Sequence, residues 1–332
     1  MRGETMDPIR EGAAGRAAEA PCAKPSDDIG RASSAAEPPR GLFITFEGGD
    51  GAGKSTQIRF LARFLEERGC EVLRLREPGG TAVGESLRRV VLDPAHGAMS
   101  DRAELLIYEA ARAQIVDEVI KPALGRGAVV LCDRFYDSTV AYQGAGRGLD
   151  GFFIEAANRF ACDGLAPDAT VLLVASEEVV RSRMGRREGA DRLERAGDAF
   201  HRRVADGFEE LAAADPARVH RVESQLHRAD TFRAVLAALD DVLPGAAEAL
   251  AADDSSLDVL VTEVMEEKRR ERARERRRKD ARKRRRDRKG DRGGKDGRAG
   301  EKRKSKDSSD GKARSGGKGA KGRKRSKGER RG

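Results

Sequence analysis

The run from Gly48 to Ser55, GGDGAGKS, fits the phosphate-binding pattern GxxxxGK[ST]. Glycines let such a loop curl so that successive backbone N–H groups point at one anion, and the helix that follows adds its positive N-terminal end. In this pattern Lys54 reaches the outer phosphates of a nucleotide, and the Ser55 hydroxyl can ligate Mg²⁺. The loop therefore predicts binding of ATP with magnesium. The residues that we expect to contact ATP are Gly48, Gly49, Asp50, Gly51, Ala52, Gly53, Lys54, Ser55 and Thr56.

Charged residues also follow two other apolar runs, at Arg76 and at Asp133-Arg134. Ligands of open α/β sheets collect at the carboxyl ends of the strands, so we expect these junctions to lie near the phosphate loop. Asp133 can hold Mg²⁺ through water, and Arg134 can bind a phosphate through its planar guanidinium. The alternatives are a salt bridge at a strand end for this pair, and ordinary turn chemistry for Arg76 before Pro78.

Tyr108 and Arg112 are four residues apart on an expected helix and so share one face of it. The aromatic ring can stack on a planar base, and the guanidinium can read a carbonyl at the edge of that base. Taken alone, such a pair is more often a surface contact. It becomes a candidate base platform only together with the phosphate-binding motifs.

A third feature is a segment crowded with arginines. Transfer of a phosphoryl group spreads negative charge over three oxygens, yet the phosphate loop offers one cation, Lys54, and contains the acidic Asp50. We therefore expect a mobile lid to bring arginines over ATP, with Arg187 at the transition state. A solvated, arginine-rich helix end is the alternative. The lid candidates are Arg181, Arg183, Arg186, Arg187 and Arg192.

The elements that position these residues alternate between strand and helix over residues 41–243. Several strand candidates are apolar throughout, as expected of strands buried on both faces. The pattern predicts an α/β, P-loop NTPase-like three-layer fold with a five-stranded parallel sheet flanked by helices. We expect strands at 42–47, 71–76, 128–132, 169–174 and 219–223, and helices at 54–68, 82–91, 101–124, 151–161, 177–187, 198–213 and 229–243.

The flanks of this 332-residue chain differ from its middle in composition. Residues 1–40 are predicted to be disordered, 244–265 to form a linker and 266–332 to form a basic low-complexity tail, disordered beyond Gly290. Within the linker, residues 257–265 can form a short amphipathic helix that continues to residue 289. The tail holds about 33 Lys and Arg against about 12 Asp and Glu, so its charge is roughly +21 and the remainder of the chain carries roughly −12. Non-specific binding of nucleic acid or another polyanion and a merely solubilising extension both remain open for it.

Other classes of protein are disfavoured. No secretory segment and no stretch as long as a membrane span is apparent, so we expect a cytoplasmic protein. The four cysteines are isolated from one another and from histidines at ligand spacing, which argues against a zinc site and a disulfide framework.

Taken together, the motifs closely resemble those of bacterial thymidylate kinase in order and spacing, over residues 41–243. The resemblance implies a homodimer that moves the γ-phosphoryl of ATP onto dTMP to give dTDP. Family members with an acidic loop residue carry a basic lid, as here. The motifs are residues 46–56, 76–81 and 108–112, Asp133-Arg134, Ser138-Thr139 and 141–144.

The resemblance also implies roles for individual residues. Tyr108 takes the place of the aromatic that stacks on thymine and Arg112 that of the arginine reading a thymine carbonyl, while Arg134 holds the dTMP phosphate. Thr139 and Gln143 lie near the base, and Tyr142 excludes a ribose 2′-hydroxyl. Asp50 contacts the sugar and phosphate region of the acceptor, and Arg76 completes the candidate substrate set.

Two other functions remain open. One is a kinase of another nucleoside monophosphate, which the Tyr108 to Arg112 platform and the Tyr142-Gln143 segment disfavour. The other is a nucleic-acid-bound P-loop ATPase that uses the basic tail as its anchor.

Overall fold

A computed structural model describes residues 40–184, 191–252 and 254–296. Its five strands form one sheet in the order β2-β3-β1-β4-β5, and every neighbouring pair is parallel. This confirms the predicted fold class. The strands are β1 (Phe43–Glu47), β2 (Val72–Arg76), β3 (Val129–Asp133), β4 (Ala169–Ala175) and β5 (Val219–Ser224).

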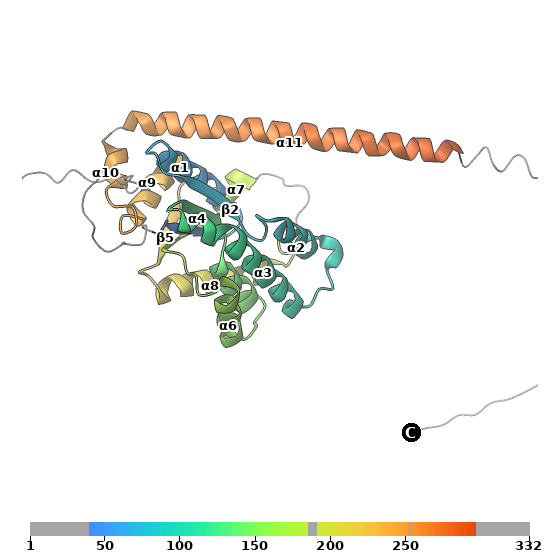
Figure 1. Ribbon diagram of the computed structural model, residues 1–332, viewed down its shortest axis with the longest axis horizontal. Helices are drawn as coiled ribbons and strands as arrows, with labels where there is room; N and C mark the ends of the chain where they lie inside the picture. The colour runs from blue at the N-terminus through green and yellow to red at the C-terminus, as the bar shows by residue number, and fades with distance from the viewer. Residues whose placement is uncertain (1–39, 185–190, 253, 297–332) are drawn as a thin grey trace, which may run out of the picture. The chain divides into compact units, whose positions relative to one another are not determined.

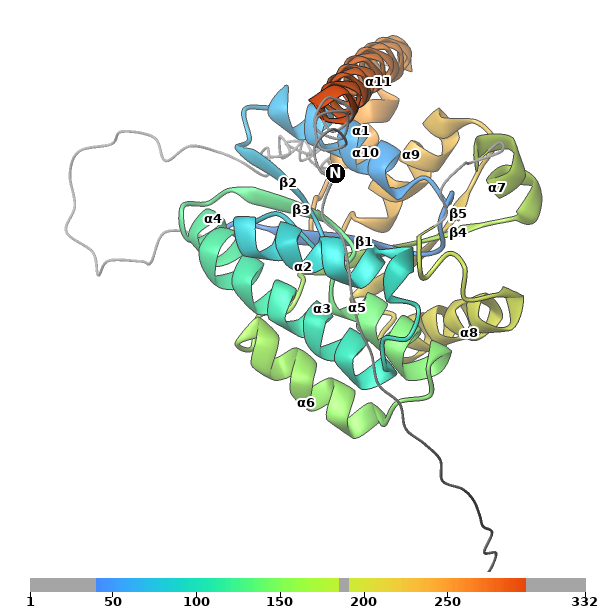
Figure 2. The same cartoon turned by 90° about the vertical axis from the view of Figure 1, so that its right-hand side faces the viewer.

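Helices cover both faces of the sheet (Figures 1 and 2). On one face, α1 (Lys54–Glu66) and α9 (Arg228–Ala238) bury Phe60, Phe64 and Phe232 in one apolar cluster with β1 and β4. On the other face lie α3 (Asp101–Ile115), the π-helix η2 (Val116–Ile120), α4 (Lys121–Gly125), α5 (Tyr136–Thr139), the π-helix η3 (Val140–Gly146), α6 (Gly151–Cys162) and α8 (Asp198–Ala214). The remaining elements are α2 (Ala82–Leu92), η1 (Pro94–His96), α7 (Glu177–Met184), α10 (Ala246–Ala251) and α11 (Asp254–Asp296).

Strand register brings three functional junctions to one level of the sheet. Asp133 at the end of β3 pairs with Phe46 of β1 on one side and with Arg76 of β2 on the other. Because all three strands are parallel, their carboxyl ends meet at the same edge. The phosphate loop, the Asp133-Arg134 pair and the turn after Arg76 therefore open onto a common region.

The chain divides into two compact units, residues 1–268 and 269–332. The expected linker at 244–265 is helical, and α11 begins inside the first unit, where Leu257, Leu260 and Val264 belong to the apolar cluster of α1 and α9. In the second unit the described residues, up to Asp296, continue α11. Residues 1–39 and 297–332, which we predicted to be disordered, lie outside the described residues.

Candidate active site

The phosphate loop joins β1 to α1 and depends on a glycine at its first turn. Gly48 has φ of 119°, which side chains other than hydrogen rarely allow, and a Cβ there would lie 2.2 Å from the carbonyl oxygen of Leu173. The loop can thus pass directly over β4. It delivers the chain to the N-terminus of α1, where the first backbone N–H groups lack helical partners and can bind an anion.

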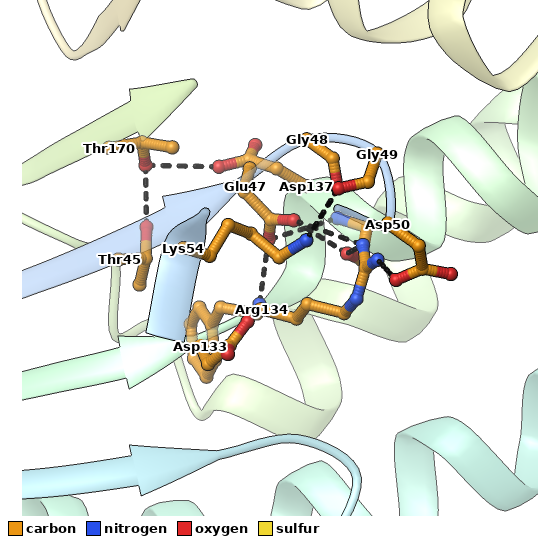
Figure 3. A network of polar contacts seen from close by, with 12 residues as sticks. Thr45, Glu47, Gly48, Gly49, Asp50, Lys54, Asp133, Arg134, Asp137 and Thr170 are labelled. Carbon is orange, nitrogen blue, oxygen red and sulfur yellow. Dashed lines mark hydrogen bonds and ion pairs between the residues drawn. The ribbon is translucent and has the colours of Figure 1, made fainter. Parts of the chain in front are cut away.

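Lys54 closes this loop from inside. Its Nζ donates hydrogen bonds to the carbonyl oxygens of Gly48 at 2.8 Å and Gly49 at 3.0 Å (Figure 3). Burial, followed by the nearby Arg134 cation, lowers the pKa of Lys54 to about 8. An anion at the loop would stabilise the charged ammonium, so the side chain is suited to meet a phosphate there.

Ser55 and Asp133 are in direct contact although 78 residues separate them. The Ser55 hydroxyl donates to Oδ2 of Asp133 at 2.6 Å. Magnesium in nucleotide sites takes only one or two oxygen ligands from the protein, with phosphate and water oxygens filling its octahedron. The described residues contain no cluster of three or more His, Cys, Asp or Glu that could hold a metal alone. The Ser55 hydroxyl and the Asp133 carboxylate are oxygen groups of the kind that magnesium takes beside a nucleotide.

Arg134 faces the phosphate loop from the end of β3. It adopts φ of 73°, an uncommon conformation for a residue with a side chain, and such outliers concentrate at functional sites. Its guanidinium donates to Oδ1 of Asp50 at 3.0 Å and to the hydroxyl of Ser138 at 3.2 Å, and lies 5.0 Å from the centre of the Tyr142 ring. The structure thus brings Asp50, Arg134 and Tyr142 together.

Glu47 holds the turn that presents Arg134, and the sequence reasoning missed it. This fully buried carboxylate accepts the backbone N–H of Phe135 at 2.7 Å and the hydroxyl of Ser138 at 2.6 Å, and lies 3.9 Å from the Arg134 guanidinium. Burial raises the pKa of Glu47 to about 7 despite the opposing effect of Arg134. A carboxylate at the last position of an otherwise apolar strand, directly before the loop, was the available signal.

A second set of contacts anchors α5, the short helix that follows Arg134. The Thr170 hydroxyl donates to Asp137 at 3.1 Å and lies 2.7 Å from the hydroxyl of Thr45 (Figure 3). Arg218 donates to both carboxylate oxygens of Asp137. These bonds tie α5 to β1 and β4. The first residues after β3 are consequently held in place by these two strands and by Arg218.

Arg112 and Tyr108 lie on α3, but their environments differ. Arg112 is only 1% exposed and donates to Glu77 at 2.9 Å, Glu109 at 2.6 Å and Thr139 at 2.9 Å, which brings two predicted site residues together. Its role in reading a base stays a prediction. Burial, followed by the charge of Glu104, raises the pKa of the half-buried Tyr108, and the charges of Arg134 and Arg192 also act on it.

Gln143 and Arg76, two further predicted site residues, each form hydrogen bonds with a glutamate. Gln143 is buried on η3 next to Tyr142 and donates from Nε2 to Glu104 at 2.7 Å. Arg76 donates from one nitrogen to both oxygens of Glu85 on α2, at 2.9 and 3.0 Å, which engages it at the turn after β2. Substrate contact by Arg76 stays a prediction.

Two residues of the arginine-rich segment, Arg183 and Arg192, have described contacts. Arg183 on α7 donates to the carbonyl oxygen of Ala52 in the phosphate loop at 2.6 Å and to Ser224 at 2.8 Å. Arg192 donates to the carbonyl oxygen of Val91 at 2.9 Å and to Glu104. Arg187, our candidate for the transition-state contact, and Arg186 lie outside the described residues.

Comparison with known proteins agrees with this arrangement. The family model described as thymidylate kinase matches residues 46–234, from the end of β1 to α9. The chain belongs to the thymidylate kinase family. The match includes every predicted site residue, since these run from Gly48 to Arg187, and excludes both flanks.

Individual thymidylate kinases are similar to this chain over nearly their full length. The thymidylate kinase of Pelotomaculum thermopropionicum is 47% identical over 211 residues, which cover 62% of this chain and 98% of the relative. That of Pseudomonas syringae pv. syringae is 48% identical over 204 residues, 61% of this chain and 95% of the relative. A crystal structure of thymidylate kinase from Ehrlichia chaffeensis is 33% identical and covers 60% of this chain and 100% of its own, with a TM-score of 0.51.

One further structural finding concerns membranes. None of the helices in the described part of the chain is both long and apolar enough to cross a bilayer.

Proposed function

We propose that this protein transfers the γ-phosphoryl group of ATP to dTMP, giving dTDP and ADP. The observation that carries the proposal is the pairing of Arg134 with Asp50 at 3.0 Å across the mouth of the phosphate loop, in a chain of the thymidylate kinase family. Lys54 contacts the loop from inside, and Arg134 faces it. Two anions can therefore be held in line, one on each side.

The reaction needs alignment and charge neutralisation more than proton transfer. An oxygen of the dTMP phosphate is already anionic and can attack the γ-phosphorus without a general base. The loop amides and Lys54 bind the donor phosphates, and Arg134 binds the acceptor phosphate. Asp50, held by Arg134, borders the acceptor side of the loop. As charge develops on the transferred group, these fixed cations stabilise it.

Magnesium is proposed as the metal cofactor, held by Ser55 and, through water, by Asp133. The contact of 2.6 Å between their oxygens supports this assignment, because it places two hard oxygen ligands beside the loop. When bound, the ion neutralises charge on the donor phosphates. The protein's part is to fix one oxygen in the first turn of α1 and the other at the end of β3.

Substrate specificity provides the test. Purified protein with ATP and Mg²⁺ is assayed by coupled ADP release against dTMP, dUMP, CMP, GMP and AMP. We expect the highest kcat/KM for dTMP, and Lys54→Ala should lower kcat by about 100- to 1,000-fold while the fold is retained. A higher kcat/KM for another monophosphate would replace the substrate, and ATP hydrolysis stimulated by DNA without any acceptor would favour the nucleic-acid-bound ATPase.

We further propose that the protein is a homodimer. The α6 helix exposes Phe152 at 85% and Phe160 at 87%, and Leu106 on the neighbouring α3 is also exposed. Large apolar side chains on adjacent helices form the kind of face that a second copy buries. We also propose that the protein is cytoplasmic.

For the basic tail we propose non-specific binding of nucleic acid. The described part of the second unit, from Arg269 to Asp296, is helical and contains 17 Lys and Arg against six Asp and Glu. Such a charge density attracts phosphate backbones and releases their counterions, so binding would weaken steeply with salt.

A further inference from the structure

The contact between Thr56 and Lys268 joins the phosphate-binding helix to a segment far from it in the sequence. Thr56 is the third residue of α1 and is buried. Its Oγ1 accepts a hydrogen bond of 2.6 Å from Nζ of Lys268 on α11, across 212 residues. Both residues belong to the first compact unit, which ends at Lys268. The family match ends at residue 234, so Lys268 comes from outside it.

The packing of the start of α11 explains why Lys268 is held there. Leu257, Leu260 and Val264 follow one another at spacings of three and four, and all three are buried in the apolar cluster of α1 and α9. Lys268 comes four residues after Val264, so it lies on the same face of the helix. It is half-buried, whereas the next residue, Arg269, is exposed. A cation therefore occupies the next position of an apolar stripe.

A second pair fixes the direction of this part of α11 along α1. Arg63 donates to Glu263 at 3.0 Å. From this pair to the pair of Thr56 and Lys268, the chain runs forward along α11 and backward along α1, so the two helices are antiparallel. The start of α11 thus advances toward the N-terminal end of α1. It brings Lys268 to the turn that directly follows the phosphate loop.

Positive charge accumulates at this turn. The N-terminal end of a helix carries a partial positive charge, and the first turn of α1, which is described in full, contains no acidic residue. Lys54 adds a cation from inside the loop, and Lys268 adds one from α11. The carboxylate that contacts the turn, Asp133 at Ser55, is the one proposed for magnesium. A cation at this end of a helix is unfavourable unless an anion lies nearby, so the arrangement fits a bound phosphate.

The side chains of the turn point in successive directions. Lys54 contacts the loop carbonyls and Ser55 contacts Asp133. In this motif such residues serve the β- and γ-phosphates and their magnesium. Each further residue of an α-helix is rotated by about 100° around the axis. Thr56 and Lys268 therefore face another side of the nucleotide, where the α-phosphate remains to be bound.

We propose that Lys268 is a donor-binding residue, which binds the α-phosphate of ATP together with Thr56. The proposal rests on the proposed function, in which ATP is the donor. A hydroxyl that accepts a hydrogen bond from an ammonium can still donate its own hydrogen, so Thr56 can link Lys268 to a phosphate oxygen. The start of α11 is then part of the nucleotide site of this enzyme.

The experiment compares Lys268→Gln with the wild-type full-length enzyme by calorimetric titration with ATP and with ADP, in the presence of Mg²⁺ and without dTMP. We expect Kd to rise by roughly 5- to 30-fold for both nucleotides, because both carry an α-phosphate and lose one charge-assisted hydrogen bond. In the coupled assay the KM for ATP should rise and the KM for dTMP should remain unchanged. Lys268→Arg keeps the cation and should restore most of the affinity.

Two further variants separate nucleotide binding from helix packing. Arg63→Gln removes the ion pair with Glu263 at the other contact between α1 and α11, so it should leave both Kd values as in the wild type. Lys268→Met keeps an apolar stem against α1 and removes the charge. It should weaken binding of both nucleotides even if Lys268→Gln fails to fold.

The outcomes are distinct. If the wild type phosphorylates dTMP and the Kd values of Lys268→Gln and Lys268→Met are unchanged, the inference is wrong and the proposed function stands. A loss of affinity for ATP but not for ADP would also overturn the inference, since it would place the contact at the γ-phosphate. So would an equal loss in Arg63→Gln, which would make the effect one of packing. A wild type that binds no ATP would instead remove the proposed function.

Discussion

At the scale of single residues, the site is built from charges buried in opposing pairs. Glu77 contacts Arg112 at 2.9 Å, and both are almost completely buried. Burial raises the pKa of Glu77 to about 7, ahead of the lowering effect of Arg112. One oxygen of Glu77 and one of Glu109 are buried without a hydrogen-bond partner among the described residues. Such a cluster costs stability and positions α3 against β2 and α6.

This pair predicts how stability changes with pH. Between pH 4.5 and about 7 folded Glu77 keeps a proton that the unfolded chain releases, so its contribution is fully present below pH 4.5 and is lost as pH rises through 7. We expect Glu77→Gln to remove this contribution, so that the free energy of unfolding falls less steeply than in the wild type, by up to about 1.4 kcal/mol per pH unit. Urea unfolding at pH 5, 6 and 7 measures this. Equal slopes of unfolding free energy against pH in the two proteins would contradict this prediction. The pKa of Glu47 is also raised, but because Glu47 is present in both proteins its effect cancels in the comparison.

At the scale of elements, two features matter: the backbone path of the phosphate loop and the exposed apolar side chains of α6. The loop must cross β4 at Gly48, where any side chain meets the Leu173 carbonyl. Its neighbour Gly49 has open space around it. On α6 the aromatic residues point outward instead of into the core.

The two loop glycines form a matched pair. Gly48→Ala should destabilise the protein by about 2 kcal/mol or more and weaken ATP binding, because the loop must move away from β4. Gly49→Ala should change the free energy of unfolding by no more than about 0.5 kcal/mol. Thermal unfolding and ATP titration measure both effects. Similar losses for the two variants would show that the crossing at Gly48 is not what requires glycine.

The α6 face predicts a change of oligomeric state. Phe160→Glu should convert a homodimer into a monomer, since it buries a charge in the proposed interface, and unfolding of the monomer should still be cooperative. Light scattering after gel filtration gives the mass. An exposed control on another surface, Val259→Glu, should leave the mass unchanged. A monomeric wild type would end the dimer proposal.

At the scale of the whole molecule, the catalytic unit and the basic segment are separate compact parts. The first unit ends at Lys268, beyond the segment that we expected to be a linker. Leu250, Leu257 and Leu260 within that segment are buried in the apolar cluster of α1 and α9. The enzyme body and the candidate polyanion-binding part can therefore be tested apart.

Truncation after Lys268 should preserve dTMP kinase activity and abolish the salt-sensitive binding to duplex DNA that we expect of the full chain. Truncation after Leu243 should lower stability severely, because each fully buried leucine contributes about 2 kcal/mol. Coupled assays, fluorescence anisotropy at increasing salt and thermal unfolding provide the measurements. Full DNA binding by the chain ending at Lys268 would contradict the tail proposal, and equal melting of the two truncated chains would contradict the role of the buried leucines.

Much of this protein was determined by local sequence. The apolar runs with glycine and charged residues at their ends predict the strands, the parallel sheet and the phosphate loop, because hydrophobic periodicity and turn chemistry act over neighbouring residues. Lys54, Ser55, Asp133 and Arg134 follow from their place after such strands. Family motifs supplied Tyr108 and Gln143.

Only the tertiary structure decided which of these side chains meet. Glu47, Glu104 and Arg183 act through partners 39 to 131 residues away, and no spacing along the chain encodes such contacts. The burial of Arg112 and the packing of the start of α11 likewise depend on which faces the fold covers. A sequence specifies donors and acceptors one by one, whereas their pairing and pKa values arise when folding removes water from between them.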